Sequence, residues 1–365
     1  MRISEVVMDG MVDLRQRAVF LRACRGEETA YTPIWLMRQA GRYMPAYRAV
    51  RAKYSMLEVI GTPELAAEVT LQPIDAFGMD AAIIFSDILP PLIGMGLELE
   101  FAKGEGPVIH NPVAAAADVA RLRTPPAAEH MAATLQAIRL VTAELTPRGV
   151  PLIGFAGAPF TLASYAVEGG GSKTYSKTKA LMVTAPQAWD ELMRKLVTVQ
   201  VDYLRQQAAA GAAALQLFDS WAGLALGLQD YVQYVQPYNR MLFAALAETG
   251  VPVINFSTGT AAYLDEVAAC GGDVIGVDWR LPLDMAWARV GTQRPVMGNL
   301  DPVLLLTDWP TLQARVDDVL QRAARVRAAG GAAHIFNLGH GIFPNTPVEN
   351  VRRLVAYVQD VTRSS

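Results

Sequence analysis

Two arginines four residues apart follow the first apolar run of the chain. Arg38 and Arg42 flank a short loop, and Arg51 follows it closely. In a helical turn, side chains four apart point the same way, so both guanidinium groups could reach one ligand. Guanidinium groups keep their charge and bind carboxylates through paired hydrogen bonds. The pattern favours a site for a polycarboxylate; a solvent-exposed basic face with ordinary ion pairs is the alternative. The loop between the two arginines contains Gln39, Ala40 and Gly41.

An aspartate follows the second apolar run. Asp87 comes shortly after Ile83-Ile84-Phe85. A carboxylate at such a position is partly removed from water, and it could accept hydrogen bonds from ligand N–H groups or stabilise a developing positive charge. An ordinary helix N-cap is the alternative. Two unit charges about 4 Å apart attract by about 4 kcal/mol at an effective dielectric of about 20, which corresponds to roughly a thousandfold in rate.

Three further polar side chains follow other apolar runs: Tyr165, Ser220 and His340. Tyr165 could donate a hydrogen bond, and His340, which stands between two glycines, could bind carboxylates or transfer protons near neutral pH. Each has a plainer alternative, because tyrosines are often half-buried in a core, loop serines usually bond to backbone, and single histidines are commonly structural. Polar, glycine-rich segments follow every apolar run, and this coincidence favours a shared site.

Eight short apolar runs alternate with helical sequence and must position these side chains. Each run is too short for a helix, and most are apolar throughout, as strands covered on both faces should be. The alternation predicts an α/β protein, a single-domain (β/α)8 TIM barrel over residues 1–365, with its working groups beyond the carboxyl ends of the strands. An open doubly wound sheet is the alternative. The runs are Pro33–Met37, Ala81–Phe85, Leu152–Ala156, Ala213–Phe218, Val253–Phe256, Val274–Val277, Pro295–Met297 and His334–Leu338.

The intervals between the runs carry helix signals. Thr62-Pro63-Glu64 combines an N-cap hydroxyl, a proline in the first turn and an acid, and Thr346-Pro347 with Glu349 repeats the pattern. Residues 191–207 place apolar side chains at helical spacing, with Arg194 and Lys195 free to face water. These signals predict helices that begin near residues 63 and 347 and one that covers 191–207.

The longest intervals lie in the N-terminal half of the chain. We therefore expect extra helices or loops over residues 92–111 and 169–179. The segment Gly169–Thr174 resembles a phosphate-binding loop, but Ser172 stands before Lys173 where that motif has glycine. We interpret its three glycines as a mobile flap.

Composition limits the class of protein. The 365 residues include 35 acidic and 32 basic side chains, which gives a formal net charge of −3. This charge argues against a nucleic-acid binder, so an anionic ligand must be attracted by local bases. Cys24 and Cys270 are the only cysteines, and neither they nor any carboxylate–histidine cluster indicate a metal site. The N-terminus lacks a signal-peptide pattern and no run is long enough for a membrane span, so we expect a cytoplasmic protein.

Several segments resemble the uroporphyrinogen decarboxylase family. Pro33–Pro45 resembles its N-terminal signature, and Gly154–Leu162 resembles its second signature. The similarity extends from about Arg17 to Val361. Further matching segments follow in the family's order: Phe85–Leu89, Val167–Ser172, Phe218–Gly223 and Asn337–Gly341.

The resemblance implies a cofactor-free (β/α)8 carboxy-lyase, usually a homodimer. Such an enzyme removes carbon dioxide from the four acetate side chains of uroporphyrinogen III and gives coproporphyrinogen III, on the route to haem and chlorophyll. The resemblance also implies that Asp87 receives the pyrrole N–H groups of the substrate and stabilises the transition state. The remaining substrate contacts that it implies are Arg38, Gln39, Ala40, Gly41, Arg42, Arg51, Tyr165, Ser220 and His340.

The residues and the resemblance both indicate that the substrate itself accepts the electrons left behind when carbon dioxide departs. The chain has six lysines, none after Lys195, so a Schiff-base lysine on a late strand is absent. Protonation of a pyrrole carbon would make a cation that accepts the electrons left by carbon dioxide, and Asp87 could stabilise this cation. The proton donors stay open between an arginine-bound water, Tyr165, His340 and a substrate carboxyl.

Two other functions compete with this interpretation. A zinc-dependent methyltransferase of the same superfamily would need a His-x-Cys pair, whereas Ala268 precedes Cys270 at that spacing. A non-catalytic tetrapyrrole carrier would keep the arginines but would not need Asp87.

Overall fold

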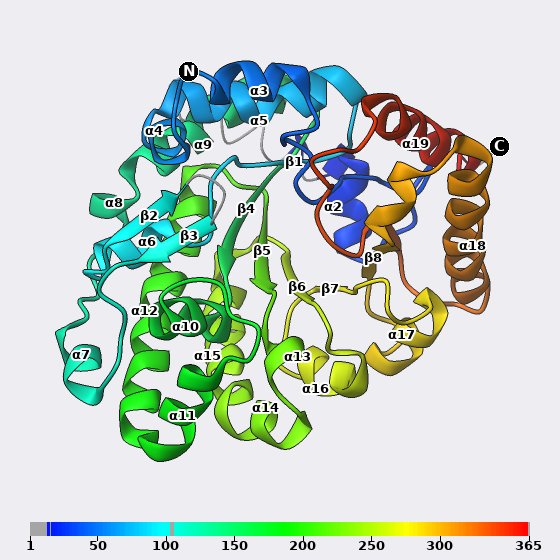
Figure 1. Ribbon diagram of the computed structural model, residues 1–365. Coiled ribbons are helices and arrows are strands. Elements are labelled where there is room, and N and C mark those ends of the chain that lie inside the picture. Colours follow the sequence, from blue (N-terminus) through cyan, green and yellow to red (C-terminus); the bar gives the residue numbers. More distant parts are fainter. Residues whose placement is uncertain (1–12, 15, 103–105, 364–365) are drawn as a thin grey trace.

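A curled parallel sheet of seven strands forms the centre of the part of the chain that the structure describes (Figure 1). This computed structural model describes residues 13, 14, 16–102 and 106–363. The segment 1–12, in which we expected no signal peptide, lies outside the described residues. The strands are β1 (Ala82–Ile83), β4 (Leu152–Gly157), β5 (Ala214–Asp219), β6 (Val253–Ser257), β7 (Val274–Gly276), β8 (Val296–Leu300) and β9 (His334–Leu338). They pair in the order β1-β4-β5-β6-β7-β8-β9.

Seven of the eight expected strands are therefore confirmed, and the first apolar run differs. Pro33–Met37 forms only one bridge, in which Ile34 pairs in parallel with Phe336 of β9. A regular ladder fails because side chains take its backbone donors: the N–H of Met37 donates to Asn337 Oδ1 at 3.0 Å and that of Leu36 to Gln39 Oε1 at 3.2 Å. On its other side, the backbone N–H of Asp80 donates to the Ile34 carbonyl at 2.9 Å.

Helices surround the sheet, as Figure 1 shows. In the first half of the described chain they are α2 (Val19–Cys24), α3 (Pro45–Arg51), α4 (Met56–Gly61), α5 (Pro63–Phe77), α6 (Pro90–Gly94), α7 (Ala116–Arg121), α8 (Ala127–His130), α9 (Ala132–Leu145) and α10 (Pro159–Glu168). In the second half they are α11 (Ser176–Thr184), α12 (Pro186–Ala210), α13 (Ala222–Ala225), α14 (Leu228–Tyr234), α15 (Gln236–Leu246), α16 (Leu264–Ala268), α17 (Leu283–Val290), α18 (Trp309–Ala328) and α19 (Val348–Val361). Short 3₁₀ turns cover 146–148, 247–249, 261–263 and 302–306.

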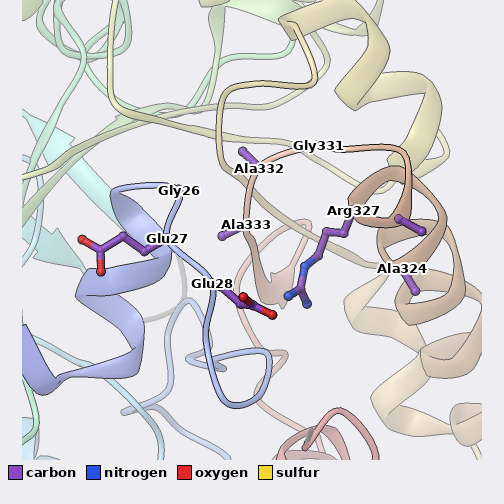
Figure 2. A pocket seen from close by; sticks show the side chains of 9 residues that line it. Gly26, Glu27, Glu28, Ala324, Arg327, Gly331, Ala332 and Ala333 are labelled. Carbon is purple, nitrogen blue, oxygen red and sulfur yellow. The ribbon is translucent and has the colours of Figure 1, made fainter.

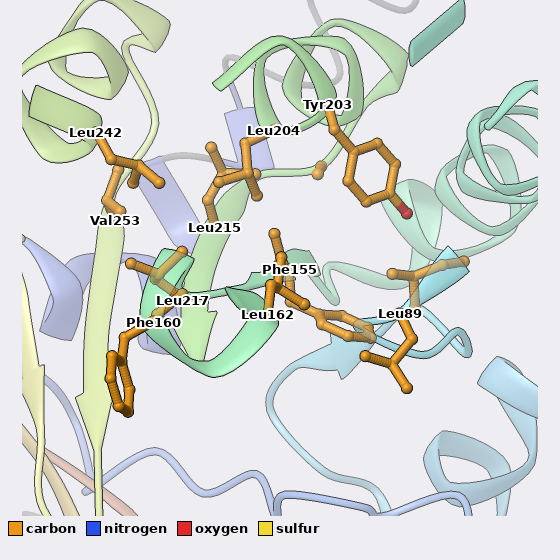
Figure 3. Packing of buried hydrophobic residues seen from close by; sticks show 14 of the residues in the cluster. Leu89, Phe155, Phe160, Leu162, Tyr203, Leu204, Leu215, Leu217, Leu242 and Val253 are labelled. Carbon is orange, nitrogen blue, oxygen red and sulfur yellow. The ribbon is translucent and has the colours of Figure 1, made fainter. Parts of the chain in front are cut away.

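The two faces of the sheet bury different apolar clusters. Because side chains alternate along a strand, Ile254 of β6 and Ile335 of β9 point to an inner cluster that also holds Trp35 and residues of α2. Their neighbours point outward to the helices. Figure 3 shows the outer packing, in which Leu204 of α12 lies beside Leu215 of β5 and Leu162 of α10 lies beside Phe155 of β4. Apolar burial on both faces explains why these strands read as continuous apolar runs.

Three of the expected local features need correction. The interval 92–111 contains a hairpin of β2 (Leu99–Ala102) and β3 (Gly106–Ile109) in place of helices or loops alone. Gly170 bridges to Val108 of this hairpin, so the glycine triplet interpreted as a flap is hydrogen-bonded to it. The helix expected over 191–207 is part of α12, but Lys195 Nζ donates to the Val119 carbonyl at 2.8 Å and is not free to face water.

The two expected threonine N-caps also differ from the structure. Thr62 is the N-cap residue of α5, but its side chain makes no capping hydrogen bond. The N-cap residue of α19 is Pro347, one position later than predicted. Across residues 13–14, 16–102 and 106–363, no helix has both the length and the apolar character needed to cross a membrane.

Candidate active site

Asp87 lies just beyond β1, at the carboxyl end of the sheet. Its Oδ1 accepts the backbone N–H of Leu89 at 3.0 Å, which closes a turn before α6 begins at Pro90. The carboxylate is half-buried. Burial raises its pKa above the usual value, although the N–H of Leu89 and the charge of Arg38 act in the opposite direction. The free site therefore holds a poorly solvated carboxylate that a positive charge would stabilise strongly.

Arg38 lies in a non-helical turn, whereas its spacing with Arg42 predicted a turn of helix. Its φ angle of 61° is left-handed, and α3 begins only at Pro45. The buried side chain of Gln39 fixes this turn by accepting the Leu36 N–H and by donating to the Ala81 carbonyl at 3.1 Å. The Gln39 amide is thus engaged with protein backbone, in contrast to the substrate contact that the resemblance implies.

The charge of Arg38 reaches three of the other expected site residues. Burial makes the largest contribution to the pKa shifts of Asp87, Tyr165 and His340, and beyond burial the Arg38 guanidinium lowers all three pKa values. A Cβ atom on Gly341 would overlap the Arg38 side chain, so the arginine stem passes directly over this glycine. The structure therefore brings together four side chains that come from the first apolar run, β1, α10 and the end of β9.

Tyr165 is held by an aromatic stack that the sequence did not indicate. It lies on α10, which starts directly after β4, and its ring stacks on Trp221 with 3.9 Å between the ring centroids. Tyr175 packs edge-on against the same tryptophan. Burial, together with the charge of Asp87, raises the pKa of Tyr165 to about 12. Its phenol is therefore protonated at neutral pH and can donate a hydrogen bond.

Ser220 is positioned through its backbone. Its N–H donates to Thr161 Oγ1 at 3.1 Å, and its carbonyl accepts the hydroxyl of Thr258 at 2.8 Å. Thr161 in turn donates to the buried carboxylate of Asp219, the last residue of β5, at 2.9 Å. Among the described residues the Ser220 hydroxyl has no hydrogen-bond partner, so it is available to a ligand.

His340 is a neutral hydrogen-bond donor in the free protein. Its Nδ1 accepts the backbone N–H of Gly341 at 2.8 Å, which places the ring proton on Nε2. Burial, followed by the positive charges of Arg38 and Arg280, lowers the pKa of His340 to about 4. At pH 7 the imidazole can bind a carboxylate through its Nε2–H but carries no charge.

The other two arginines are less closely connected to this group. Arg42 is exposed, and its carbonyl accepts Arg48 Nη1 at 2.9 Å. Arg51 Nη1 donates to the Tyr54 carbonyl, in the turn that follows α3. Ala40 and Gly41 complete the loop between Arg38 and Arg42, and both are half-buried.

A hollow of about 430 Å³ lies at the other end of the sheet (Figure 2). Its lining includes Glu28, Arg327 and Ala333, and Ala333 directly precedes β9. None of the expected site residues lines it. The sequence-predicted residues instead cluster at the carboxyl strand ends, where ligands bind in parallel α/β folds.

The fold and these side chains define an α/β protein with a candidate enzyme site at the carboxyl ends of parallel strands. The family model described as uroporphyrinogen decarboxylase (URO-D) matches residues 15–361. The chain belongs to the uroporphyrinogen decarboxylase family, whose named reaction is that of a carboxy-lyase.

Relatives match over nearly their whole length. The chain is 53% identical over 346 residues to the uroporphyrinogen decarboxylase of Carboxydothermus hydrogenoformans, and the match covers 95% of this chain and 97% of that protein. It is 55% identical over 346 residues to the Sorangium cellulosum enzyme of the same name, with the same coverage of both. The family resemblance expected from the sequence is confirmed.

A solved structure supports the fold alone. A methyltransferase from Methanosarcina mazei superposes with a TM-score of 0.76 at 19% identity and covers 95% of this chain and 98% of that one. Among the described residues, no group of three or more histidine, cysteine, aspartate or glutamate side chains is placed to hold a metal ion. Cys270 contacts Tyr231, whose hydroxyl lies 3.3 Å from its sulfur.

Proposed function

We propose that this chain removes carbon dioxide from the four acetate side chains of uroporphyrinogen III and so produces coproporphyrinogen III. Membership of the family supports the reaction. The observation that carries the proposal is the grouping of Asp87 with Arg38, Tyr165 and His340 at one end of the sheet. One carboxylate with nearby donors and a guanidinium suits a substrate that has pyrrole N–H groups at its centre and eight carboxylates around them.

The framework of the proposed enzyme is a closed (β/α)8 barrel in one catalytic domain. The first apolar run supports this, because it bonds to β9 through Ile34 and Phe336 and accepts the N–H of Asp80 just before β1. In this proposal the first apolar run fills the gap between the two edge strands of the sheet. A homodimer and a cytoplasmic location stay predictions; light scattering of the purified chain tests the first.

Substrate binding in this proposal begins with the arginines. The exposed guanidinium groups of Arg38 and Arg42 bind substrate carboxylates, and Arg51 does so at the outer edge. Backbone N–H groups of Ala40 and Gly41 lie in the same loop. We assign Gln39 to positioning this loop, because both ends of its amide are bonded to backbone.

Asp87 acts during the chemical step. A proton adds to a pyrrole carbon, and the resulting cation lies against the Asp87 carboxylate. The bond between the acetate methylene and its carboxyl carbon then breaks, carbon dioxide leaves, and the electron pair flows into the cationic ring. A second proton adds to the exocyclic carbon to form a methyl group, and the ring loses the first. A fixed, poorly solvated carboxylate stabilises this cation more than it stabilises the neutral substrate.

The proton transfers involve groups that are protonated at neutral pH. Tyr165 has a raised pKa of about 12, so its phenol keeps its proton at neutral pH and can deliver it. His340, whose pKa is lowered to about 4, is neutral at pH 7 and donates a hydrogen bond through its Nε2–H without delivering a proton. Arginine-bound water and a substrate carboxyl are the other donors within this proposal. Ser220 offers a hydroxyl for orientation of the ring.

Anaerobic incubation with uroporphyrinogen III tests the function. We expect coproporphyrinogen III and carbon dioxide in a ratio of about one to four, without added cofactor. A tetrapyrrole carrier would bind the substrate and return it unchanged. Metal analysis of the same sample addresses the methyltransferase alternative, because stoichiometric zinc together with absence of the product would favour that reaction.

A further inference from the structure

A second guanidinium group lies beside His340, and none of the sequence motifs pointed to it. Arg280 follows β7 by four residues, whereas Arg38 follows the first apolar run, which bonds to β9. Burial makes the largest contribution to the lowered pKa of His340, and the positive charges of Arg38 and Arg280 lower it further. Two arginines from separate strand ends therefore flank one histidine of the candidate site.

Arg280 is held in place by the residue two positions before it. Its Nη1 donates to Asp278 Oδ2 at 2.5 Å, and its backbone N–H donates to Asp278 Oδ1 at 3.0 Å. The Asp278 side chain is only 5% exposed and also accepts the Gly259 N–H at 2.7 Å. A buried carboxylate with three donors is a rigid anchor, so the guanidinium has a fixed orientation.

Trp279 joins Arg280 to the histidine. The Arg280 guanidinium stacks on the Trp279 ring, with its carbon 4.3 Å from the ring centroid. The same ring packs edge-on against His340, with 6.3 Å between the centroids. A Cβ atom on Gly339 would overlap the Trp279 backbone, so the two loops touch directly there. The stack thus fixes Arg280 relative to the imidazole.

Part of the guanidinium is free for a ligand. The side chain of Arg280 is 40% exposed. Only Nη1 has a hydrogen-bond partner among the described residues, which leaves Nε and Nη2 without a protein acceptor there. The planar arrangement of these donors suits a carboxylate, and the stack and the Asp278 bond reduce the entropy that binding must remove.

We propose that Arg280 binds a carboxylate of the tetrapyrrole substrate next to His340. This inference rests on the proposed function and adds a substrate-binding residue to it. The ligand is a carboxylate in a ring of eight, so Arg38 and Arg280 hold different side chains of one molecule. Arg280 contributes to affinity and orientation and takes no part in the bond-breaking step.

Steady-state kinetics with uroporphyrinogen III test this inference through three variants: Arg280→Gln, Arg280→Ala and Arg280→Lys. We expect loss of the guanidinium to raise KM about tenfold and to change kcat by less than about twofold, because one charged hydrogen bond is removed from ground and transition state alike. Arg280→Lys should recover part of the affinity, since it keeps the charge without the paired donors.

Arg353 provides a matched control. It is another exposed arginine stacked on a tryptophan, with its guanidinium carbon 4.2 Å from the ring centroid of Trp309. Arg353→Gln should leave KM unchanged. As a second readout, NMR titration of His340 should show a higher midpoint in Arg280→Gln than in the unmodified protein, because a positive charge beside the ring is removed.

The outcomes separate this inference from the proposed function. If the unmodified protein forms coproporphyrinogen III but Arg280→Gln and Arg353→Gln have the same KM, the role of Arg280 is refuted and the function stands. If the unmodified protein forms no product, the function fails. Fluorescence titration with uroporphyrin, the oxidised substrate, then decides on Arg280: about tenfold weaker binding in Arg280→Gln supports the contact, and equal binding overturns it.

Discussion

Arg38 connects the residues of the candidate site more than any other side chain. Its left-handed backbone and its passage over Gly341 direct the guanidinium toward the group that contains Asp87, Tyr165 and His340. The sequence predicted that Arg38 and Arg42 share a helical turn, but Arg38 has a left-handed backbone and α3 begins only at Pro45. Arg38 instead lies in a loop fixed by the buried Gln39 amide.

Replacement of Arg38 should therefore impair turnover strongly. We expect Arg38→Ala to lower kcat/KM by about a hundredfold, because a charged contact with the substrate is lost next to a poorly solvated carboxylate. Arg194→Ala is the control: Arg194 is exposed on α12, where it pairs with Asp190 at 2.8 Å. Similar losses in the two variants would show that the Arg38 loop does not bind the substrate.

The ionisation of His340 gives a second test at this scale. Because burial and two neighbouring arginines lower its pKa to about 4, the ring should titrate near pH 4 in an NMR experiment on the folded protein. His340 should therefore cause no change in the rate near pH 6.5. The pH profiles of the unmodified protein and of His340→Asn should have the same shape around this pH. A ring midpoint near 6.5 would mean that the imidazole is neither desolvated nor close to the arginines.

The same shift has a consequence for stability. The folded-state pKa of His340 lies below the usual value of 6.5, so the unfolded chain binds the proton first as the pH falls. This group therefore contributes stability that is fully present above about pH 6.5 and is lost between about pH 6.5 and 4. Buried His334 also has a pKa lowered to about 4 by burial and acts in the same direction.

At the scale of elements, the site depends on how loops from distant strands meet. The Gly339–Gly341 loop after β9 touches Trp279 on one side and Arg38 on the other. Both glycines lack the Cβ atom that would separate these neighbours. The loop thus sets the distance between two segments that lie far apart in the sequence.

Gly341→Ala should disturb the site without unfolding the protein. The new methyl group would overlap Cγ and Cδ of Arg38 and displace this side chain, so we expect kcat/KM to fall about tenfold. Because Arg38 is exposed, the melting temperature should change by only about a few degrees. Gly227→Ala is the control, because a Cβ atom there has nothing within 4 Å. An unchanged rate in Gly341→Ala would separate the position of Arg38 from catalysis.

The sequence predicted strands well because each is apolar on both faces. It missed the β2–β3 hairpin, whose residues are not a continuous apolar run, and it could not show that side-chain amides would replace the ladder at Met37 and Leu36. It also missed the Trp279–Arg280 stack. Asp278 and Trp279 follow the run Val274–Val277, but only the contact of Trp279 with His340 shows that this segment faces the site.

At the scale of the whole molecule, the protein and its proposed substrate carry net charge of the same sign. The chain carries a formal net charge of −3, yet the proposed substrate is a polyanion. Attraction must therefore come from the exposed arginines at the carboxyl ends of the strands. The hollow at the other end of the sheet contains Glu28 as well as Arg327 and offers no comparable group of bases.

Added salt should weaken substrate binding for this reason. The distance over which exposed charges interact falls from about 10 Å at 0.1 M salt to about 3 Å at 1 M. We expect KM for uroporphyrinogen to rise over this range, with little change in kcat, because Asp87 is shielded from solvent in the complex. A KM independent of salt would contradict binding by exposed arginines.

The central claim is that the Asp87 carboxylate stabilises a cationic pyrrole ring. The most direct measurement is the single-turnover rate of coproporphyrinogen formation by Asp87→Asn under anaerobic conditions. Asparagine keeps the shape and can still accept the Leu89 N–H, so only the charge is removed. Asp265→Asn is the control, because the Asp265 side chain is exposed on α16.

We predict that Asp87→Asn binds uroporphyrin nearly as the unmodified protein does but forms product about a thousandfold more slowly, which is the loss expected for about 4 kcal/mol of charge interaction. A rate within about threefold of the Asp265→Asn control would contradict the account, because the ring cation would then need no carboxylate at this position.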